Sequence, residues 1–274
     1  MLAGYVLGLR EGLEAALILG ITFGVLRRMN RSELAPVAWL GVGVAVGLSI
    51  IAAAILSLIG ARLEGTAEEL FEGTMMLFAS GVLTWMILWM AQQGRQSQLG
   101  IEREIEVAAT RRQRTAVFAI AFFAVLREGI ETALFLSAAA FQDSQAGVFA
   151  GGLAGIATAA LLGWGLYRAT IRLDIRGFFR VTGAILILFA AGLFAHGIHE
   201  FVEAGVLPAL IDPLWTTEYL ISESSFVGTL LRTLFGYNAD PTLTEVLAYF
   251  AYFVTVLVFV RRTQVRSSQW SPAS

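Results

Sequence analysis

A charged sequence of five residues occurs twice in stretches of the chain that are otherwise almost entirely apolar. It reads Arg-Glu-Gly-Leu-Glu at 10–14 and Arg-Glu-Gly-Ile-Glu at 127–131, and we call these two copies the cassettes. Residues three and four positions apart lie on the same face of a helix, so the two glutamates of each cassette project together. Hard metal ions prefer carboxylate oxygens as ligands. Two such helix faces could therefore bind a hard cation between them.

The cassettes supply four carboxylates and two guanidinium groups, which come from Glu11, Glu14, Glu128, Glu131, Arg10 and Arg127. A carboxylate at the depth of a bilayer costs at least about 2.5–3.5 kcal/mol. In a purely structural interpretation each arginine locks one glutamate in an ion pair, which leaves one surplus carboxylate in each cassette. We therefore favour a cation site, in which the arginines neutralise the empty site and orient its ligands. Gly12 and Gly129 remove bulk beside the carboxylates, which allows either a close helix contact or a local break.

The composition of the whole chain is that of a membrane protein. Of the 274 residues, 57% are hydrophobic and only 15% are charged, with a mean hydropathy of +0.72. A soluble domain has about 25% charged residues. The chain has no cysteine, which excludes thiolate metal ligands. It also has no lysine and therefore no phosphate-binding loop for ATP, and nothing in its net charge of −2 indicates a nucleic-acid partner.

Long apolar runs predict an all-α, polytopic membrane protein with seven transmembrane helices. A helical span needs about 20 mostly apolar residues. Five spans are predicted from uncharged runs at 34–61, 73–94, 144–167, 181–199 and 246–260, the last beginning near residue 242 at a capping sequence. Two further spans, at about 3–26 and 115–141, carry the cassettes near their middle.

The distribution of arginine predicts the direction of these spans. Fifteen of the nineteen basic residues lie in alternate connections and in the C-terminal tail, whereas the other connections hold only Arg62 and Arg232. Positively charged residues are enriched on the cytoplasmic side. We therefore expect a multi-pass protein of the plasma (inner) membrane, with its N-terminus outside and its C-terminus in the cytoplasm.

An internal repeat relates the first three spans to the next three. The cassettes occupy matching depths, and the sequence LFASGVL at 77–83 resembles LFAAGLF at 188–194. Units with an odd number of spans cross in opposite directions, which predicts a 3+3 inverted-topology repeat followed by one C-terminal helix. The predicted single transmembrane domain comprises repeat 1 (1–94), a cytoplasmic loop (95–114), repeat 2 (115–205), an extracytoplasmic loop (206–241), span 7 (242–262) and a cytoplasmic tail (263–274).

Acidic and histidine residues are expected at the outer ends of the third and sixth spans. Candidates for cation capture at this outer mouth are Glu68, Glu69, Glu72, His199, Glu200 and Glu203. The alternative for the first three is stabilisation of a helix N-terminus, and for the last three a polar helix end that meets water. The sequence HEFVE fails the zinc-hydrolase pattern because Glu203 stands where a second histidine is needed. Trp85, Trp89 and Trp164 are interpreted as interfacial anchors, and Met90 as a packing residue.

The paired cassettes in a chain of seven predicted spans resemble the high-affinity iron permeases, which include the fungal oxidase-coupled and the bacterial EfeU-type permeases. The similarity extends to AHGIHEFVEAG at 195–205 and LFGYNADPTLTEVLAY at 234–249. It implies iron transport through Glu11, Glu14, Glu128 and Glu131, with Fe³⁺ favoured, or Fe²⁺ that is oxidised as it enters. It also implies extracytoplasmic partners that oxidise or deliver iron.

The spacing of the glutamates does not by itself select iron, and two alternatives stay open at this point. The first is a secondary transporter of another divalent cation or of protons. The second is an intramembrane metalloenzyme built on His196, His199, Glu200 and Glu203, but this has no nucleophile motif and leaves the cassettes unexplained. We therefore expect a permease rather than an enzyme, with iron as the transported substrate and no permanently bound cofactor.

The predicted orientation is testable with a reporter fused after Ser274. Because arginine is concentrated in the connections assigned to the inside, a reporter that works only in the cytoplasm should be active there. Activity of a reporter that works only outside the cytoplasm would overturn both the orientation and the inverted repeat.

Overall fold

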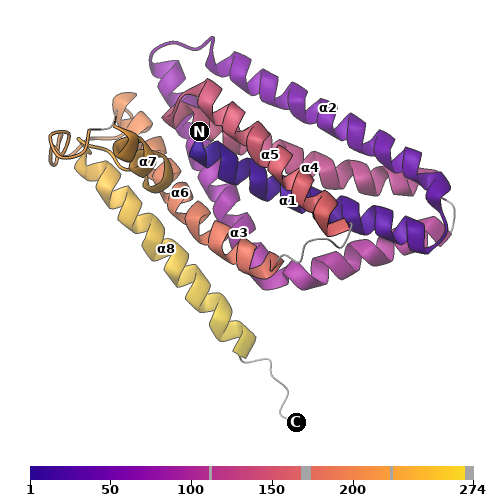
Figure 1. Ribbon diagram of the computed structural model, residues 1–274. Coiled ribbons are helices and arrows are strands. Elements are labelled where there is room, and N and C mark those ends of the chain that lie inside the picture. The colour runs from indigo at the N-terminus through magenta and orange to yellow at the C-terminus, as the bar shows by residue number, and fades with distance from the viewer. Residues whose placement is uncertain (111–112, 168–173, 223–224, 269–274) are drawn as a thin grey trace. The chain divides into compact units, whose positions relative to one another are not determined.

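The computed structural model describes residues 1–110, 113–167, 174–222 and 225–268, and within these ranges it contains helices and no strands. Arg111, Arg112, Arg168 and Arg172, four of the arginines that predict the orientation, lie outside the described residues, as does 269–274 of the predicted tail. The helices (Figure 1) are α1 (Leu2–Arg28), the short η1 (Ser32–Leu34), α2 (Ala35–Gly60), α3 (Thr66–Thr110), α4 (Arg114–Gln142), α5 (Gln145–Tyr167), α6 (Ile175–Glu203), α7 (Phe226–Phe235) and α8 (Leu243–Ser268).

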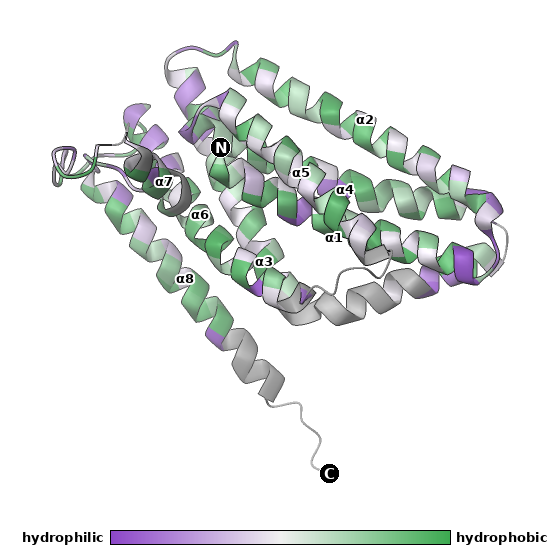
Figure 2. Ribbon diagram, in the orientation of Figure 1, coloured by the Kyte–Doolittle hydropathy of each residue, from purple (hydrophilic) through white to green (hydrophobic). Residues whose placement is uncertain are grey.

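Within the described ranges, five helical segments are long and apolar enough to cross a membrane. They are Ser32–Gly60, Thr66–Met90, Gln145–Gly165, Gly177–Glu203 and Leu243–Arg261, and they overlap the five spans predicted from uncharged runs. Figure 2 shows that α2 has almost no hydrophilic residue between its ends. The cassette helices α1 and α4 are continuous over 27 and 29 residues. Their length suffices for a span. The crossing of the membrane by these two charged helices stays a prediction.

Helix α3 continues well beyond its apolar part. The segment 95–114, predicted as a cytoplasmic loop, is helical as far as Thr110. The helix persists because Ile105, Ala108 and Ala109 form a buried apolar face, which packs in one cluster with Leu26 of α1. An ion pair between Arg28 and Glu106 joins the same two helices. The high charge of this segment therefore indicates an amphipathic helix, and its side of the membrane stays a prediction.

The chain forms two compact units. Unit 1 comprises Met1–Arg62 and Trp89–Ala184, and it contains α1, α2, α4, α5 and the second part of α3. Unit 2 comprises Leu63–Leu88 and Ile185–Ser274, and it contains the first part of α3, most of α6, and α7 and α8. Both cassettes belong to unit 1, whereas all candidates for the outer mouth belong to unit 2.

In unit 1, α1 packs along α5 and α4 packs along α2 (Figure 1). Both contacts depend on glycines of the cassettes. A Cβ atom on Gly12 would lie 2.8 Å from the Cβ of Ala159 in α5, and one on Gly129 would overlap the hydroxyl of Ser49 in α2. Small residues let helix backbones approach closely in this way. Since α1 and α4 are unbroken, the cassette glycines serve close contact rather than a break in the helix.

In unit 2, α3 and α6 pack through the two similar sequences LFASGVL and LFAAGLF. The hydroxyl of Ser80 donates a hydrogen bond of 2.7 Å to the carbonyl oxygen of Ala190. Thr84, one turn further along α3, lies 2.6 Å from the hydroxyl of Tyr252 in α8. These hydrogen bonds satisfy buried polar groups where water is excluded.

The contact between α1 and α5 predicts a steric effect at Gly8. A Cβ atom on Gly8 would overlap the backbone carbonyl oxygen of Gly152, whereas one on Gly20 of the same helix would meet nothing within 4 Å. Gly8→Ala should therefore destabilise the protein by about 1–3 kcal/mol, as overpacking does. Gly20→Ala should be neutral or slightly stabilising, because alanine favours helix. Thermal unfolding of the two purified variants in detergent measures this difference, and equal unfolding temperatures would contradict it.

Candidate metal centre

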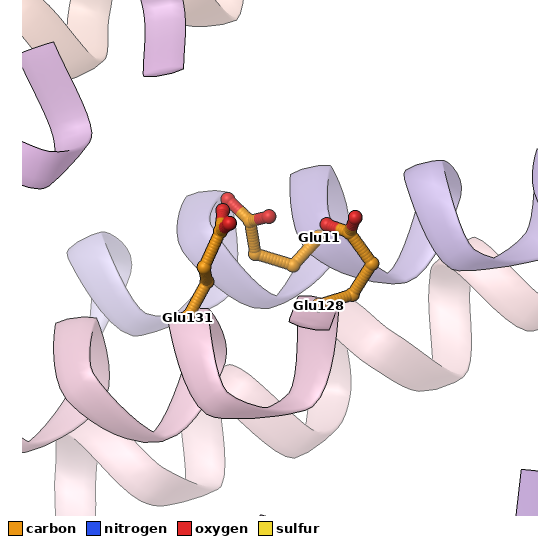
Figure 3. Close-up of side chains that lie close together, drawn as sticks. All are labelled: Glu11, Glu128 and Glu131. Carbon is orange, nitrogen blue, oxygen red and sulfur yellow. The ribbon is translucent and has the colours of Figure 1, made fainter. Parts of the chain in front are cut away.

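The glutamates of the two cassettes meet between α1 and α4. Figure 3 shows the side chain of Glu11 pointing toward those of Glu128 and Glu131. One carboxylate oxygen of each lies within 4.8 Å of the other two. Hard divalent cations bind oxygen at about 2.0–2.6 Å, which places opposite ligands up to about 5 Å apart. Such a cation would therefore fit among the three carboxylates without a large movement of either helix.

These carboxylates are buried and incompletely satisfied. Glu11 is 1% exposed, Glu128 4% and Glu131 9%. Among the described residues, the Oε2 atoms of all three have no hydrogen-bond partner. A buried acceptor without a donor costs free energy, and the cost is larger for a carboxylate than for a neutral group. A cation bound among the three carboxylates would supply the positive charge that the arginines provide only in part.

The arginine of each cassette contacts both glutamates of its own helix. Arg10 Nη1 lies 2.8 Å from Glu11 Oε1, and Arg10 Nη2 lies 3.1 Å from Glu14 Oε1. In α4, Arg127 Nε lies 2.9 Å from Glu131 Oε1 and 3.9 Å from Glu128 Oε1. The ion pairs four residues apart are those that the spacing predicts. Each arginine thus has both glutamates of its own cassette as ion-pair partners. The purely structural interpretation, in which one arginine pairs with one glutamate and leaves a surplus carboxylate, does not describe either cassette.

The two arginines differ in their surroundings. The side chain of Arg10 is 2% exposed and that of Arg127 is 42% exposed. Helix α3 touches both. Arg10 Nη2 lies 3.0 Å from the sulfur of Met90, and Arg127 Cζ lies 5.4 Å from the centre of the Trp89 ring.

These contacts change the interpretation of Trp89 and Met90. Trp89 contacts a cassette arginine rather than serving only as an interfacial anchor, whereas Trp85 and Trp164 are exposed. Met90 accepts a hydrogen bond rather than only filling space. Sequence spacing carries no signal for either contact, because both depend on how α3 crosses the cassette helices.

In unit 2, His199 lies between two carboxylates. Its Nε2 is 3.3 Å from Glu203 Oε1, and its Nδ1 is 3.4 Å from Glu245 Oε2. The two ring nitrogens point in different directions, so Glu203 and Glu245 do not converge with His199 on one ion. In the part of the chain that the structure describes, Glu11, Glu128 and Glu131 are the only such group close enough to share a metal.

Glu245 is a polar residue of unit 2 that sequence reasoning assigned only to a helix cap. Its backbone N–H donates to Thr242 Oγ1 at 3.2 Å, as the capping sequence predicts. Its side chain is 4% exposed and accepts a hydrogen bond of 3.0 Å from Asn238. The same side chain lines a largely apolar cavity of about 520 Å³, together with Trp215 and Tyr237. The sequence gives no sign of the contact with His199, because His199 and Glu245 lie on different helices that are far apart in the sequence.

The remaining candidates for the outer mouth lie where α3 and α6 cross. Glu68 and Glu69 are in the first turn of α3, where negative charge stabilises a helix N-terminus. At the next turn, a Cβ on Gly73 would lie 3.0 Å from Glu200 Cβ, so the crossing brings Glu72 and Glu200 close together. Whether these glutamates capture cations stays a prediction.

Long apolar helices around buried, paired charges are typical of membrane transport proteins. Comparison with known proteins gives the particular class. Residues 1–264 match the model of the Iron permease FTR1 family, and the chain belongs to this family. It is therefore a multi-pass membrane protein and an iron permease, that is, a transporter and not an enzyme. No solved structure matches the chain.

Curated relatives support this assignment over nearly the whole length. The chain is 35% identical over 260 residues to the ferrous iron permease EfeU of Escherichia coli O6:K15:H31 (strain 536), and the match covers 94% of each chain. It is also 35% identical to the protein of the same name from Shigella sonnei. With that of Yersinia pestis it shares 34% identity, over 94% of this chain and 92% of the relative.

The unequal burial of the two arginines predicts unequal effects on stability. Arg10→Gln leaves Glu11 and Glu14 buried without their cation, which should cost about 3–5 kcal/mol. The side chain of Arg127 is only partly buried, so Arg127→Gln should cost less than Arg10→Gln. Thermal unfolding of both variants in the same detergent provides the comparison. A loss for Arg127→Gln as large as that for Arg10→Gln would show that the difference in burial has no energetic consequence.

Proposed function

We propose that iron crosses the plasma (inner) membrane through the four glutamates of the cassettes, which lie near the middle of two charged transmembrane helices. The observation that carries this proposal is a group of three buried carboxylates from both helices, with one oxygen of each within 4.8 Å of the other two and with Oε2 atoms that have no hydrogen-bond partner among the described residues. Glu14 is the fourth carboxylate, held at its Oε1 by Arg10. Iron is the cargo that the family implies, and it needs no resident cofactor.

Contacts between equivalent segments support the inverted repeat. In the proposed repeat, α1 is equivalent to α4 and α2 is equivalent to α5. The contact of α1 with α5 is therefore equivalent to the contact of α4 with α2, and both contacts occur. The cassettes face each other, and the similar sequences of α3 and α6 pack together through Ser80 and Ala190. A pseudo-twofold axis brings equivalent segments together in this manner. With α1 and α4 as spans, the protein has seven transmembrane helices, of which α8 follows the two repeats.

The charge of the site bears on the valence of the iron. Four ionised glutamates and two arginines carry a formal charge of −2, which Fe²⁺ neutralises. Fe³⁺, which hard carboxylate ligands favour, would leave an excess positive charge in a medium of low dielectric constant. The relatives named above are ferrous iron permeases. We infer that the described arrangement accepts Fe²⁺, and that Fe³⁺ requires Arg127 to leave Glu131.

The orientation of the protein in the membrane is inferred from the arginine distribution. The N-terminus faces outside, iron is gathered at the outer mouth, and it leaves on the arginine-rich cytoplasmic side. Glu68, Glu69 and Glu72 on α3, with His199, Glu200 and Glu203 on α6, form that mouth in this proposal. Extracytoplasmic proteins that oxidise or deliver iron would act there. The alternative is that the same carboxylates transport another divalent cation or protons. Competition of other metal ions with iron uptake separates iron transport from this alternative.

The glutamate site is tested by single Glu→Gln substitutions at residues 11, 14, 128 and 131. Glutamine keeps the size of the side chain but removes the charge, and hard cations strongly prefer charged oxygen. Each variant should reach the membrane and lose at least about tenfold in iron uptake, because every carboxylate is a ligand. The measurement is uptake of radioactive iron, normalised to the amount of protein in the membrane.

A matched control is Glu33→Gln, which changes an exposed glutamate near the end of α1 and should transport normally. If any two of the four cassette variants transport like the unmodified protein, the four-carboxylate site is wrong.

A further inference from the structure

Arg127 and Glu131 make an incomplete ion pair. A guanidinium group usually binds a carboxylate with two parallel hydrogen bonds. Here Arg127 contacts Glu131 Oε1 through Nε, and Glu131 Oε2 has no hydrogen-bond partner in the described part of the chain. That oxygen lies in the same group of carboxylates that we propose to bind iron. A contact that holds the guanidinium in this orientation would keep that oxygen open.

The ring of Trp89 is the feature that can hold Arg127 in this orientation. The distance of 5.4 Å between Arg127 Cζ and the ring centre is within the range of a cation–π contact. Trp89 and Arg127 both belong to unit 1. Because the side chain of Arg127 is 42% exposed, packing alone does not fix it as it fixes Arg10.

We propose that Trp89 is a positioning residue of the metal site: it holds Arg127 on one oxygen of Glu131 and so leaves the other oxygen available to iron. The proposal rests on the function of the cassettes proposed above and assigns a further residue to it. Without Trp89 the guanidinium turns and closes over both oxygens of Glu131. Arginine then competes with iron for a ligand, and the affinity for iron falls.

The test is the iron concentration that gives half-maximal uptake by the full-length protein in cells, with Fe²⁺ kept reduced by ascorbate. Trp89→Leu should raise this concentration about three- to tenfold, the range of one cation–π contact, with little change in the maximal rate. Trp89→Phe keeps an aromatic face and should restore most of the affinity. Trp85→Leu is the matched control, since Trp85 lies one turn earlier on α3 with 59% exposure, and it should behave like the unmodified protein.

A double-mutant cycle shows whether Trp89 acts through Arg127. In an Arg127→Gln background, Trp89→Leu should cause no further change in the half-maximal concentration, because the group it positions is absent. An unchanged half-maximal concentration in Trp89→Leu, or the same increase with and without Arg127, would overturn the positioning role.

Glu131→Gln, measured in the same assay, separates this proposal from the one on which it rests. Loss of uptake in Glu131→Gln, with no effect of Trp89→Leu, contradicts only the role of Trp89. Normal uptake in Glu131→Gln shows that Glu131 is not a required ligand and contradicts the role of Trp89, and normal uptake in a second cassette variant as well contradicts the glutamate site itself.

Discussion

The packing of six charged groups, most of them buried, between α1 and α4 is the constraint on which the rest of unit 1 depends. Charges removed from water are costly unless they find partners. Each arginine therefore lies against the glutamates of its own helix, and the helices must approach closely enough for the two sets to meet. Gly12 and Gly129 in turn let α1 lie close against α5 and α4 lie close against α2. The two arginines neutralise the charge of the four glutamates only in part. A cation-binding site requires such an excess of negative charge.

Much of this arrangement follows from local rules. The helical period places Glu11 with Glu14 and Glu128 with Glu131, and the ion pairs of Arg10 and Arg127 follow from the same spacing. Five apolar helices are evident from composition, because a bilayer demands length and hydrophobicity of each span separately. The cap formed by Thr242 is equally local. These features depend only on residues that are close in the sequence, so they can be predicted without the tertiary structure.

Features that depend on helix crossings were not predictable. Trp89 and Met90 reach the arginines only because α3 passes beside both cassette helices. Glu245 meets His199 across two helices that lie far apart in the sequence. The helical continuation of α3 was missed for a related reason. Apolar residues such as Ile105 indicate a helix here only when the buried cluster to which they belong is known.

The glycine contacts behind the cassettes also bear on which ions the proposed site accepts. At Gly12 and Gly129 the cassette helices already lie against their neighbours with no space to retreat. The carboxylates are therefore mounted on backbones that resist outward movement. Calcium needs more ligands than smaller divalent ions do, and backbones held in this way have little freedom to bring further ligands to the site. The close packing of α1 on α5 and of α4 on α2 would therefore give the proposed site a fixed set of ligands, and a fixed set of ligands favours ions of low coordination number over calcium.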